Sequence, residues 1–254
     1  MPVPRNGRGQ YLIPVVEGDK RRAHRRATTI AKVLDDQSML MSWSQRMVAI
    51  GLGRRPDLLA MAATADPEDR KTLNEVCDSA FEAGGGTVKR NTGTSFHAAA
   101  EIVNRGGEPL PLFAEGIADY QAKLAQYGLE PIPHLVERTL VLGDYEIAGT
   151  FDMALTDGEQ LYVGDFKTGG VDFAALAISI QLAIYANADG MLSTDYERVE
   201  KPPEFNREKA IVVQAPGGEP PVQFWEVDLV AGWEAFQLAL KVEKARKRSE
   251  ITPW

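Results

Sequence analysis

Cysteine is almost absent from this chain, which has 254 residues and one cysteine, Cys77. One thiol cannot form an internal disulfide or supply the four thiolates of a cysteine metal cluster. Such usage is typical of a reducing compartment, so we expect a cytoplasmic protein. No apolar run reaches the ~20 residues of a membrane-spanning helix. Residues 1–10 also lack the apolar core of a secretory signal, so we expect no membrane partner.

An excess of basic charge is also missing, because 28 Lys and Arg residues face 36 Asp and Glu residues, a sum of −8. A negative total argues against a polyanionic partner, but the cations are clustered. Residues 20–26 (KRRAHRR) carry five cations and residues 241–248 (KVEKARKR) carry another five. Because exposed charges act over only ~8–10 Å in salt, such patches can hold a polyanion on an acidic protein. The alternative is two solvated helix faces.

The hydrophobic pattern divides the chain at about residue 90. Apolar residues in 1–90 recur mainly at helical spacing, and the glycine run 84–86 ends a helical stretch. The segment 92–107 predicts a short helix, with Thr94 or Ser95 as its N-cap and two glycines at its end. We therefore expect a mainly helical region over 1–90 and a main domain over 91–254.

Short β-branched or aromatic segments alternate with helices from about residue 135. A long apolar helix that Asp172 can cap separates the strands, and an amphipathic helix with terminal cations covers about 230–248. This order of elements predicts an α/β fold with a mixed sheet flanked by helices.

Two acids face each other in the predicted hairpin of strands 145–155 and 160–167. If residues 157–160 form the loop, Thr156 pairs with Leu161 and Asp152 lies opposite Asp165, with Cβ atoms ~4.5–5.5 Å apart. Lys167 then projects from the same face as Asp165. Opposed carboxylates repel unless a cation lies between them, and oxygen ligands of this kind favour Mg²⁺ or Mn²⁺. The alternative is an exposed hairpin with solvated charges.

Two further pairs of residues lie one helical turn apart. His97 and Glu101 share a face of their predicted helix, where an imidazole suits Mn²⁺ or Zn²⁺ and Glu101 can support it. The alternative is a histidine that only packs on a helix made mostly of alanines. Gln181 and Tyr185 lie on a mostly apolar helix and need hydrogen-bond partners there. These partners are either Lys167, a water or a phosphate, or ordinary backbone groups of the core.

In combination, these segments resemble the RecB-type branch of the PD-(D/E)XK nuclease superfamily, which includes CRISPR-associated and phage RecB-like exonucleases. The resemblance covers about 90–190 closely and the strands to about 228 loosely. Four blocks carry it in the expected order: Gly93-Thr94-x-x-His97-x-x-x-Glu101, Gly149-Thr150-Phe151-Asp152, Gly164-Asp165-Phe166-Lys167-Thr168 and Gln181-Leu182-x-x-Tyr185-Ala186.

The resemblance implies a restriction-endonuclease-like core over 91–254 and a role for each matching residue. His97, Asp152 and Asp165 would be metal ligands, with the backbone carbonyl of Phe166 as a further ligand, and Lys167 would be the catalytic lysine. Gln181 and Tyr185 would contact DNA or steady the site. Glu101 and Glu137 are further candidates beside the metals. One or two Mg²⁺ or Mn²⁺ ions would be the cofactor.

Two departures from the resemblance concern cofactors. Many relatives hold an iron–sulfur cluster through four cysteines, and with Cys77 alone we expect no such cluster. The chain also lacks a G-x-x-x-x-G-K-[ST] loop, so we expect no ATP-driven motor within it.

The function that we predict is a Mg²⁺- or Mn²⁺-dependent DNA exonuclease used in recombination, repair or phage DNA metabolism, with a helicase or recombination protein as a separate partner. One alternative is a non-catalytic or partner-activated subunit that binds nucleic acid and keeps the nuclease fold. Another is a metal hydrolase that acts on a nucleotide or other small phosphate.

Overall fold

The computed structural model describes residues 3–15 and 20–248, apart from the side chains of 88–91. Two compact units form by their own internal contacts. One unit contains Met1–Asp35 and His97–Trp254, and the other contains Asp36–Phe96. The boundary between Phe96 and His97 lies inside one helix, α5 (Gly86–Asn104).

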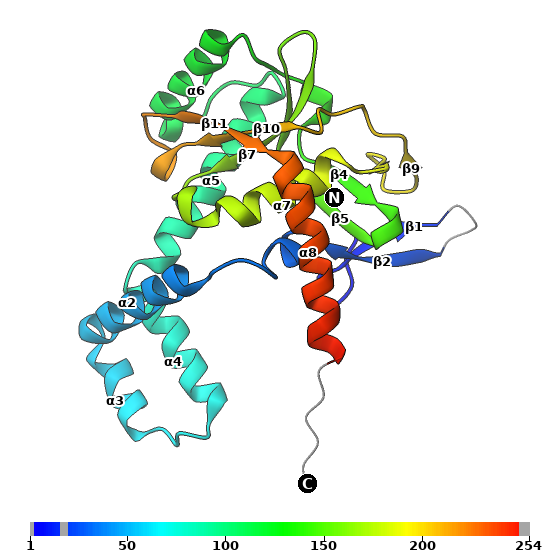
Figure 1. Cartoon of the computed structure of the whole chain (residues 1–254). Coiled ribbons are helices and arrows are strands. Elements are labelled where there is room, and N and C mark those ends of the chain that lie inside the picture. Colours follow the sequence, from blue (N-terminus) through cyan, green and yellow to red (C-terminus); the bar gives the residue numbers. More distant parts are fainter. Residues whose placement is uncertain (1–2, 16–19, 249–254) are drawn as a thin grey trace. The chain divides into compact units, whose positions relative to one another are not determined.

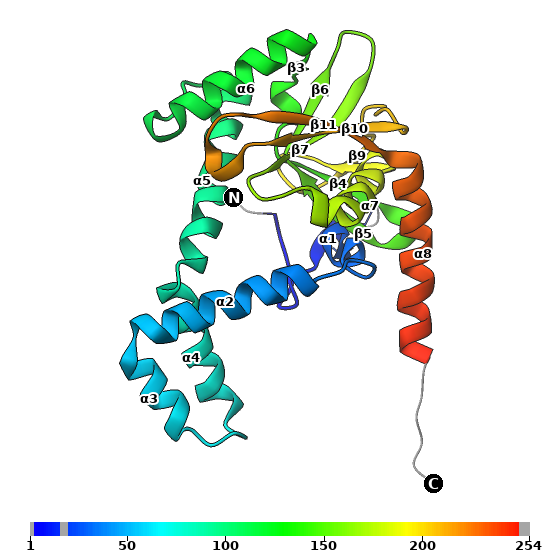
Figure 2. The same ribbon diagram turned by 60° about the vertical axis from the view of Figure 1, so that its left-hand side comes forward.

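The smaller unit is helical, as the spacing of its apolar residues predicts. Its helices are α2 (Ser38–Arg54), α3 (Pro56–Thr64), α4 (Arg70–Ala83) and the first part of α5. Figures 1 and 2 show α2 and α4 side by side. Glycine allows this approach, because a Cβ on Gly51 would lie 1.7 Å from the carbonyl oxygen of Ala80. The rings of Trp43 and Phe81 meet edge to face at 5.3 Å between centroids.

The larger unit contains two mixed sheets and is α/β in class. The six-stranded sheet has the order β1-β2-β5-β4-β8-β9, in which only β2 and β5 pair in parallel. Its strands are β1 (Tyr11–Pro14), β2 (Arg21–Arg26), β4 (Arg138–Leu142), β5 (Ile147–Phe151), β8 (Gly190–Leu192) and β9 (Val199–Glu200).

The five-stranded sheet has the order β11-β10-β7-β6-β3, and here β10 and β7 pair in parallel. Its strands are β3 (Glu130–Pro131), β6 (Met153–Thr156), β7 (Leu161–Lys167), β10 (Lys209–Gln214) and β11 (Gln223–Asp228). The sequence predicts one continuous strand over 145–155, whereas the chain bends at Asp152. There it leaves β5 in one sheet and enters β6 in the other.

Helices cover both faces of the five-stranded sheet. Helix α7 (Ala175–Ala186) faces the odd-numbered side chains of β7 and packs along α8 (Leu229–Arg248), where a Cβ on Gly232 would lie 2.4 Å from the Ser179 carbonyl oxygen. Helix α6 (Ala114–Tyr127) places Tyr120 against Phe166, an even-numbered side chain of β7. The remaining helices are α1 (Ala27–Ala31), η1 (Pro111–Phe113), η2 (Pro133–Leu135), η3 (Gly143–Tyr145), η4 (Asp172–Ala174) and η5 (Pro216–Gly218).

The prediction of a helical region over 1–90 is wrong for its first part. Residues 11–14 and 21–26 are strands, and Met1–Asp35 belongs to the unit with the sheets. The basic segment 20–26 therefore contributes β2 and is not a helix face. Strand β2 lies between β1, which directly precedes it in the chain, and β5, which is distant in the sequence, and pairing with both decides its conformation.

Two predicted helix caps are also wrong. Thr94 and Ser95 lie in the interior of α5, because this helix already begins at Gly86, directly after Gly85 with its φ of +95°. Asp172 belongs to the preceding 3-10 turn, and α7 starts without a side-chain cap. The predicted end of α5 is confirmed, since the amides of Gly106 and Gly107 donate to the carbonyls of Val103 and Ile102.

No helix in the described part of the chain combines the length and apolar character needed to cross a membrane.

Candidate functional site

Asp152 lies at the bend between β5 and β6, opposite β7. The predicted hairpin register is confirmed, because Thr156 pairs with Leu161 and the ladder continues to Met153 and Gly164. Asp152 is the next residue after this ladder. Its Oδ2 accepts a 2.7 Å hydrogen bond from the amide of Phe166, and its carbonyl oxygen accepts one of 3.0 Å from the amide of Glu137. Backbone amides of two other segments therefore hold Asp152, one at its carboxylate and one at its main-chain carbonyl.

Asp165 and Lys167 project from the face of β7 that α7 covers. The Asp165 side chain is 5% exposed, and its Oδ2 forms an ion pair with the ammonium group of Lys167. Its Oδ1 lies 3.5 Å from the Nε2 of Gln181. Oδ2 has no hydrogen-bond partner among the described residues apart from this ion-pair contact. A nearly buried carboxylate is thus left with spare acceptor capacity.

Burial and neighbouring charges shift the pKa values of Asp152 and Lys167. Burial raises the pKa of Asp152 well above its ordinary value, and the negative charge of Asp165 raises it further. Burial opposes the charged form of Lys167, but Asp165 and Asp152 outweigh it and raise the pKa of the lysine. The lysine is therefore cationic at neutral pH, while the two carboxylates repel each other.

His97 reaches the same place from α5. Its Nδ1 lies 3.5 Å from the Oδ2 of Asp152, and its ring centroid is 5.8 Å from that of Phe166. Burial lowers the pKa of His97, although Asp165 and a hydrogen bond with the Phe166 backbone oppose that shift. The imidazole is therefore mostly neutral at pH 7, which is the form that binds metal ions.

Glu101 and Glu137 lie near these groups but contact other partners. Glu101 Oε1 accepts a 3.0 Å hydrogen bond from the Nε of Arg105, the residue directly after α5. Glu137 precedes β4 with a φ of +53°, a backbone conformation that residues with a Cβ rarely adopt. Burial, then the charge of Glu101, raises the pKa of Glu137 to about 7, and solvent screens this shift because the residue is exposed.

Gln181 and Tyr185 join α7 to both carboxylate-bearing strands. Gln181 Nε2 lies 3.3 Å from the hydroxyl of Tyr185, which donates to the carbonyl oxygen of Thr150 at 3.2 Å. Gly149 makes room for the tyrosine, since a Cβ there would lie 2.5 Å from its ring. Burial raises the pKa of Tyr185 well above its ordinary value, so the hydroxyl remains a donor.

Tyr185 agrees with the interpretation that these residues bond to the backbone of the core, whereas the contact of Gln181 is one that neither interpretation named. Gln181 approaches the predicted site at Asp165, whereas Tyr185 bonds to the backbone of the core.

A residue that the sequence does not single out also reaches this region. Tyr11, in β1, is buried, and its hydroxyl contacts Thr150, two residues before Asp152. The only signal is the apolar and β-branched run that begins at Tyr11, which marks a strand and gives no information about its partner.

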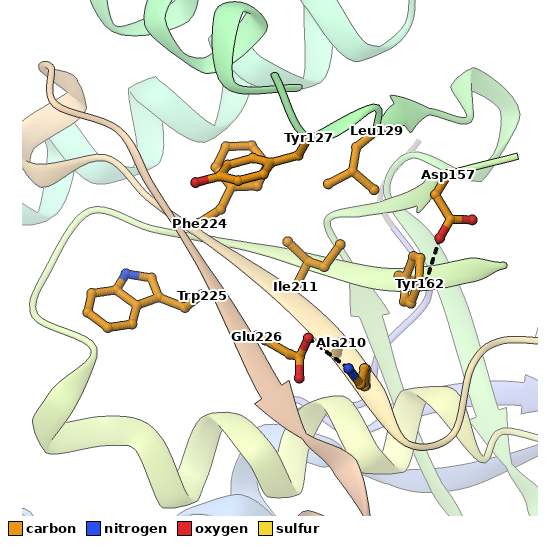
Figure 3. A pocket seen from close by; sticks show the side chains of 10 residues that line it. Tyr127, Leu129, Asp157, Tyr162, Ala210, Ile211, Phe224, Trp225 and Glu226 are labelled. Carbon is orange, nitrogen blue, oxygen red and sulfur yellow. Dashed lines mark hydrogen bonds and ion pairs between the residues drawn. The ribbon is translucent and has the colours of Figure 1, made fainter. Parts of the chain in front are cut away.

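A cavity of ≈ 320 Å³ lies on the other face of the five-stranded sheet (Figure 3). The rings of Tyr127 and Phe224 meet there at 5.5 Å, above Ile211. Its polar groups are paired, because Tyr162 donates to Asp157 at 2.8 Å and Lys209 contacts Glu226 at 3.0 Å. None of the residues predicted for the site lines it. We call this cavity the aromatic groove.

The fit of the site to a divalent cation depends on its donor set and its charge. Asp152 and Asp165 share Lys167, the charge of Glu137 also acts on Asp152, and Arg105 pairs with Glu101 and acts on Glu137. Carboxylate oxygens, a neutral imidazole and spare acceptor capacity on Asp165 suit Mg²⁺ or Mn²⁺. Within residues 3–15 and 20–248, however, no three His, Cys, Asp or Glu side chains already surround one ion position.

Comparison with known proteins identifies no family. No family model matches the chain, and no curated protein matches it. One solved structure, described as the crystal structure of SSO0001, is similar at 14% sequence identity with a TM-score of 0.28. The match covers 54% of this chain and 59% of that protein, so the chain spans less than two thirds of its length. A similarity of this size carries no argument about function.

Proposed function

We propose that this chain is a Mg²⁺- or Mn²⁺-dependent deoxyribonuclease of the RecB-type PD-(D/E)XK kind, with its site at Asp152, Asp165 and Lys167. The observation that carries the proposal is the pair of opposed carboxylates beside a lysine from the same strand. Among the described residues, the Oδ2 of Asp165 has no partner besides the Lys167 ammonium group, and the two carboxylates share that one lysine. A cluster of this kind lowers the stability of the fold, so its presence favours a functional role.

Each residue has a task in phosphodiester hydrolysis. A bound divalent cation supplies Lewis-acid stabilisation of the charge on the reacting phosphate. Asp152, Asp165 and His97 would hold that cation, with the Phe166 carbonyl beside them. The ammonium group of Lys167 would orient the attacking water and offset negative charge on the phosphate. Gln181 would keep the Asp165 carboxylate directed at this point through the contact at its Oδ1.

The end of α8 is the DNA contact that we propose. Of the cations in 20–26, three face acids: Arg21 with Glu197, Arg22 with Glu146 and Arg25 with Glu243. The pair of Arg25 with Glu243 also joins β2 to α8. Lys244, Arg246 and Arg248 are exposed near the end of that helix. These three cations therefore suit a phosphate backbone better than β2 does.

DNA cleavage by a lysine variant tests the proposal. Purified protein is incubated with end-labelled linear DNA and closed circular DNA in Mg²⁺, Mn²⁺ or EDTA. We expect metal-dependent loss of the linear DNA, and Lys167→Ala should slow it by ~10²–10³-fold. Lys209→Ala is the matched control, because it removes an ion-paired lysine of the same sheet at the aromatic groove.

Three outcomes separate the candidate functions. Equal cleavage by Lys167→Ala and the parent would show that the site is elsewhere. Intact DNA in every lane, with tight and salt-sensitive binding, would favour a non-catalytic subunit whose ligands are not assembled around an ion. Turnover of mononucleotides but not of oligonucleotides would favour a small-phosphate hydrolase.

A further inference from the structure

Tyr11 connects the N-terminal strand to the strand that ends at Asp152. The residue is 4% exposed, and its ring packs with Ile13, Val141, Ala148 and Leu192. Its hydroxyl lies 3.3 Å from the Oγ1 of Thr150 and accepts a 3.1 Å hydrogen bond from the Thr150 amide. A side chain 139 positions away in the sequence therefore binds the backbone of β5.

Thr150 needs this partner because β2 no longer pairs with β5 at that point. The parallel pairing of these strands ends at Arg26 and Ala148. Beyond it, the Thr150 amide donates to Tyr11 and the Thr150 carbonyl oxygen accepts from Tyr185. Two tyrosine hydroxyls thus bind the amide and the carbonyl of one residue, at the place where a further strand would otherwise bind.

Arg5 fixes the orientation of the Tyr11 hydroxyl. Its NH2 group donates to that hydroxyl at 2.9 Å, and its guanidinium carbon lies 4.3 Å from the centroid of the Tyr11 ring. Because the hydroxyl oxygen accepts from both Arg5 and the Thr150 amide, its own proton points to the Oγ1 of Thr150. That Oγ1 is also 2.9 Å from the Oγ1 of Thr139, which is buried in β4.

We propose that Tyr11 is a positioning residue for the Asp152 carboxylate. Asp152 follows Thr150 by two residues, and its Oδ2 accepts from the Phe166 amide on the neighbouring strand. Fixing Thr150 at its amide, carbonyl and side chain determines where the bend begins, and hence where this carboxylate lies relative to Asp165. The metal-binding part of the inference rests on the proposed function, whereas the positioning of the carboxylate does not.

The variant Tyr11→Phe isolates the hydroxyl. It keeps the ring in its apolar cluster and leaves Arg5 a ring to stack on. Tyr145→Phe is the matched control, because the Tyr145 hydroxyl accepts a 3.2 Å hydrogen bond from Gln237 in the same unit and its ring meets Trp233 and Phe236. Arg5→Ala is a second variant, which retains the hydroxyl and removes its Arg5 donor together with the guanidinium stacked on the ring.

The first measurement is amide hydrogen exchange in the metal-free protein. In Tyr11→Phe we expect the Phe166 amide to exchange about tenfold faster relative to the Val163 amide of the same strand, as loss of one hydrogen bond predicts. Arg5→Ala should give a smaller change in the same direction, and Tyr145→Phe no change. A merely structural hydroxyl would alter exchange at Thr150 and leave the ratio of Phe166 to Val163 as in the parent. That result would overturn the proposal.

The second measurement is Mn²⁺ binding by calorimetry together with DNA cleavage kinetics. Loss of a group that orients a ligand predicts ~10–100-fold weaker Mn²⁺ binding and a lower kcat that added Mn²⁺ restores, with an unchanged KM for DNA. Unchanged Mn²⁺ affinity in Tyr11→Phe would contradict a role of Tyr11 in metal binding. If the parent itself bound no Mn²⁺, the proposed function would fail, and the exchange ratio would still decide whether Tyr11 positions Asp152.

Discussion

The polar groups on the two faces of β7 differ in their exposure and in their charged partners. On the face toward α6, Tyr162 lies in the aromatic groove, where each carboxylate has a hydroxyl or ammonium partner. On the face toward α7, Asp165 is more deeply buried, lies opposite a second acid and shares one lysine with it. The five-stranded sheet therefore has paired charges on one face and two acids that share one lysine on the other. The second arrangement is what a cation-binding site requires.

The largest difference between the faces should follow from neutralising one acid on each. Asp152→Asn keeps an acceptor for the Phe166 amide and removes a charge that burial and Asp165 disfavour. We expect the free energy of unfolding of the metal-free protein at pH 7 to rise by roughly 0.5–2 kcal/mol, as relief of a strained functional site does. We also expect Mn²⁺ affinity to fall by more than about 100-fold, which exceeds the loss typical when a residue that only supports a metal ligand is replaced.

Urea unfolding without metal and calorimetry with Mn²⁺ measure both effects. Asp157→Asn is the control on the other face, because Asp157 accepts hydrogen bonds from Tyr162 and from its own turn. A destabilised Asp152→Asn protein that still binds Mn²⁺ as the parent does would remove the contrast between the faces.

Adding one methyl group should have the next largest effect. A Cβ on Gly149 would meet the Tyr185 ring at 2.5 Å, so Gly149→Ala must displace the tyrosine that bonds to Thr150. Overpacking of this kind costs ~1–3 kcal/mol, and thermal unfolding measures it. Gly169→Ala is the control, since a Cβ there has no neighbour within 4 Å. Equal melting temperatures for the two variants would mean that Tyr185 is not closely packed.

The groove should respond weakly to loss of a charge. Lys209→Ala breaks a pair with Glu226 in which both side chains are at least half exposed. Exposed pairs of this kind contribute ~0–1 kcal/mol, so we expect a small change in urea midpoint and unchanged DNA cleavage. Loss of cleavage in this variant would place the reaction, or the DNA path, on the groove face.

The smallest effect concerns acid stability far from both faces. Burial opposes the charged form of Glu243, but hydrogen bonds from Arg25 and Lys247 outweigh it and hold the pKa of Glu243 below its ordinary value. Its stabilisation is therefore present above the unfolded value of about 4.3 and is lost as pH falls through the folded value. Glu243→Gln should lower stability at pH 7 by about 1 kcal/mol or less and flatten the decrease below pH 4.5. Melting temperatures across pH 3–7 test this.

Local chemistry explains what the sequence could predict about the site. The Asp157-Gly158 turn fixes the hairpin register, and Gly158 has the φ of +92° that the turn needs. This register places Asp152 opposite Asp165, and the alternation of side chains along a strand places Lys167 on the same face as Asp165. The two-residue and four-residue spacings of strands and helices likewise account for Lys167 beside Asp165 and for Gln181 beside Tyr185.

Long-range contacts explain what the sequence could not predict. Five cations dominate 20–26 and mask its strand pattern, and the segment is a strand because it pairs with β1 and with the distant β5. The chain bends at Asp152 because the residues before it pair within one sheet and the residues after it pair within the other. Tyr11 contacts Thr150 because β1 belongs to the same sheet as β5, and no spacing rule connects residues so far apart. Glu101 shares a helix face with His97 as predicted, yet its contact is with Arg105.

The most direct test of the account is Mn²⁺ binding by the parent, Asp165→Asn and Asp157→Asn proteins, measured by calorimetry under one set of conditions. The excess negative charge at Asp152 and Asp165 predicts that the parent and Asp157→Asn bind Mn²⁺ with equal affinity, and that Asp165→Asn loses binding. Equal binding by all three proteins, or no binding by the parent, would contradict the claim that this face of β7 is a divalent-cation site.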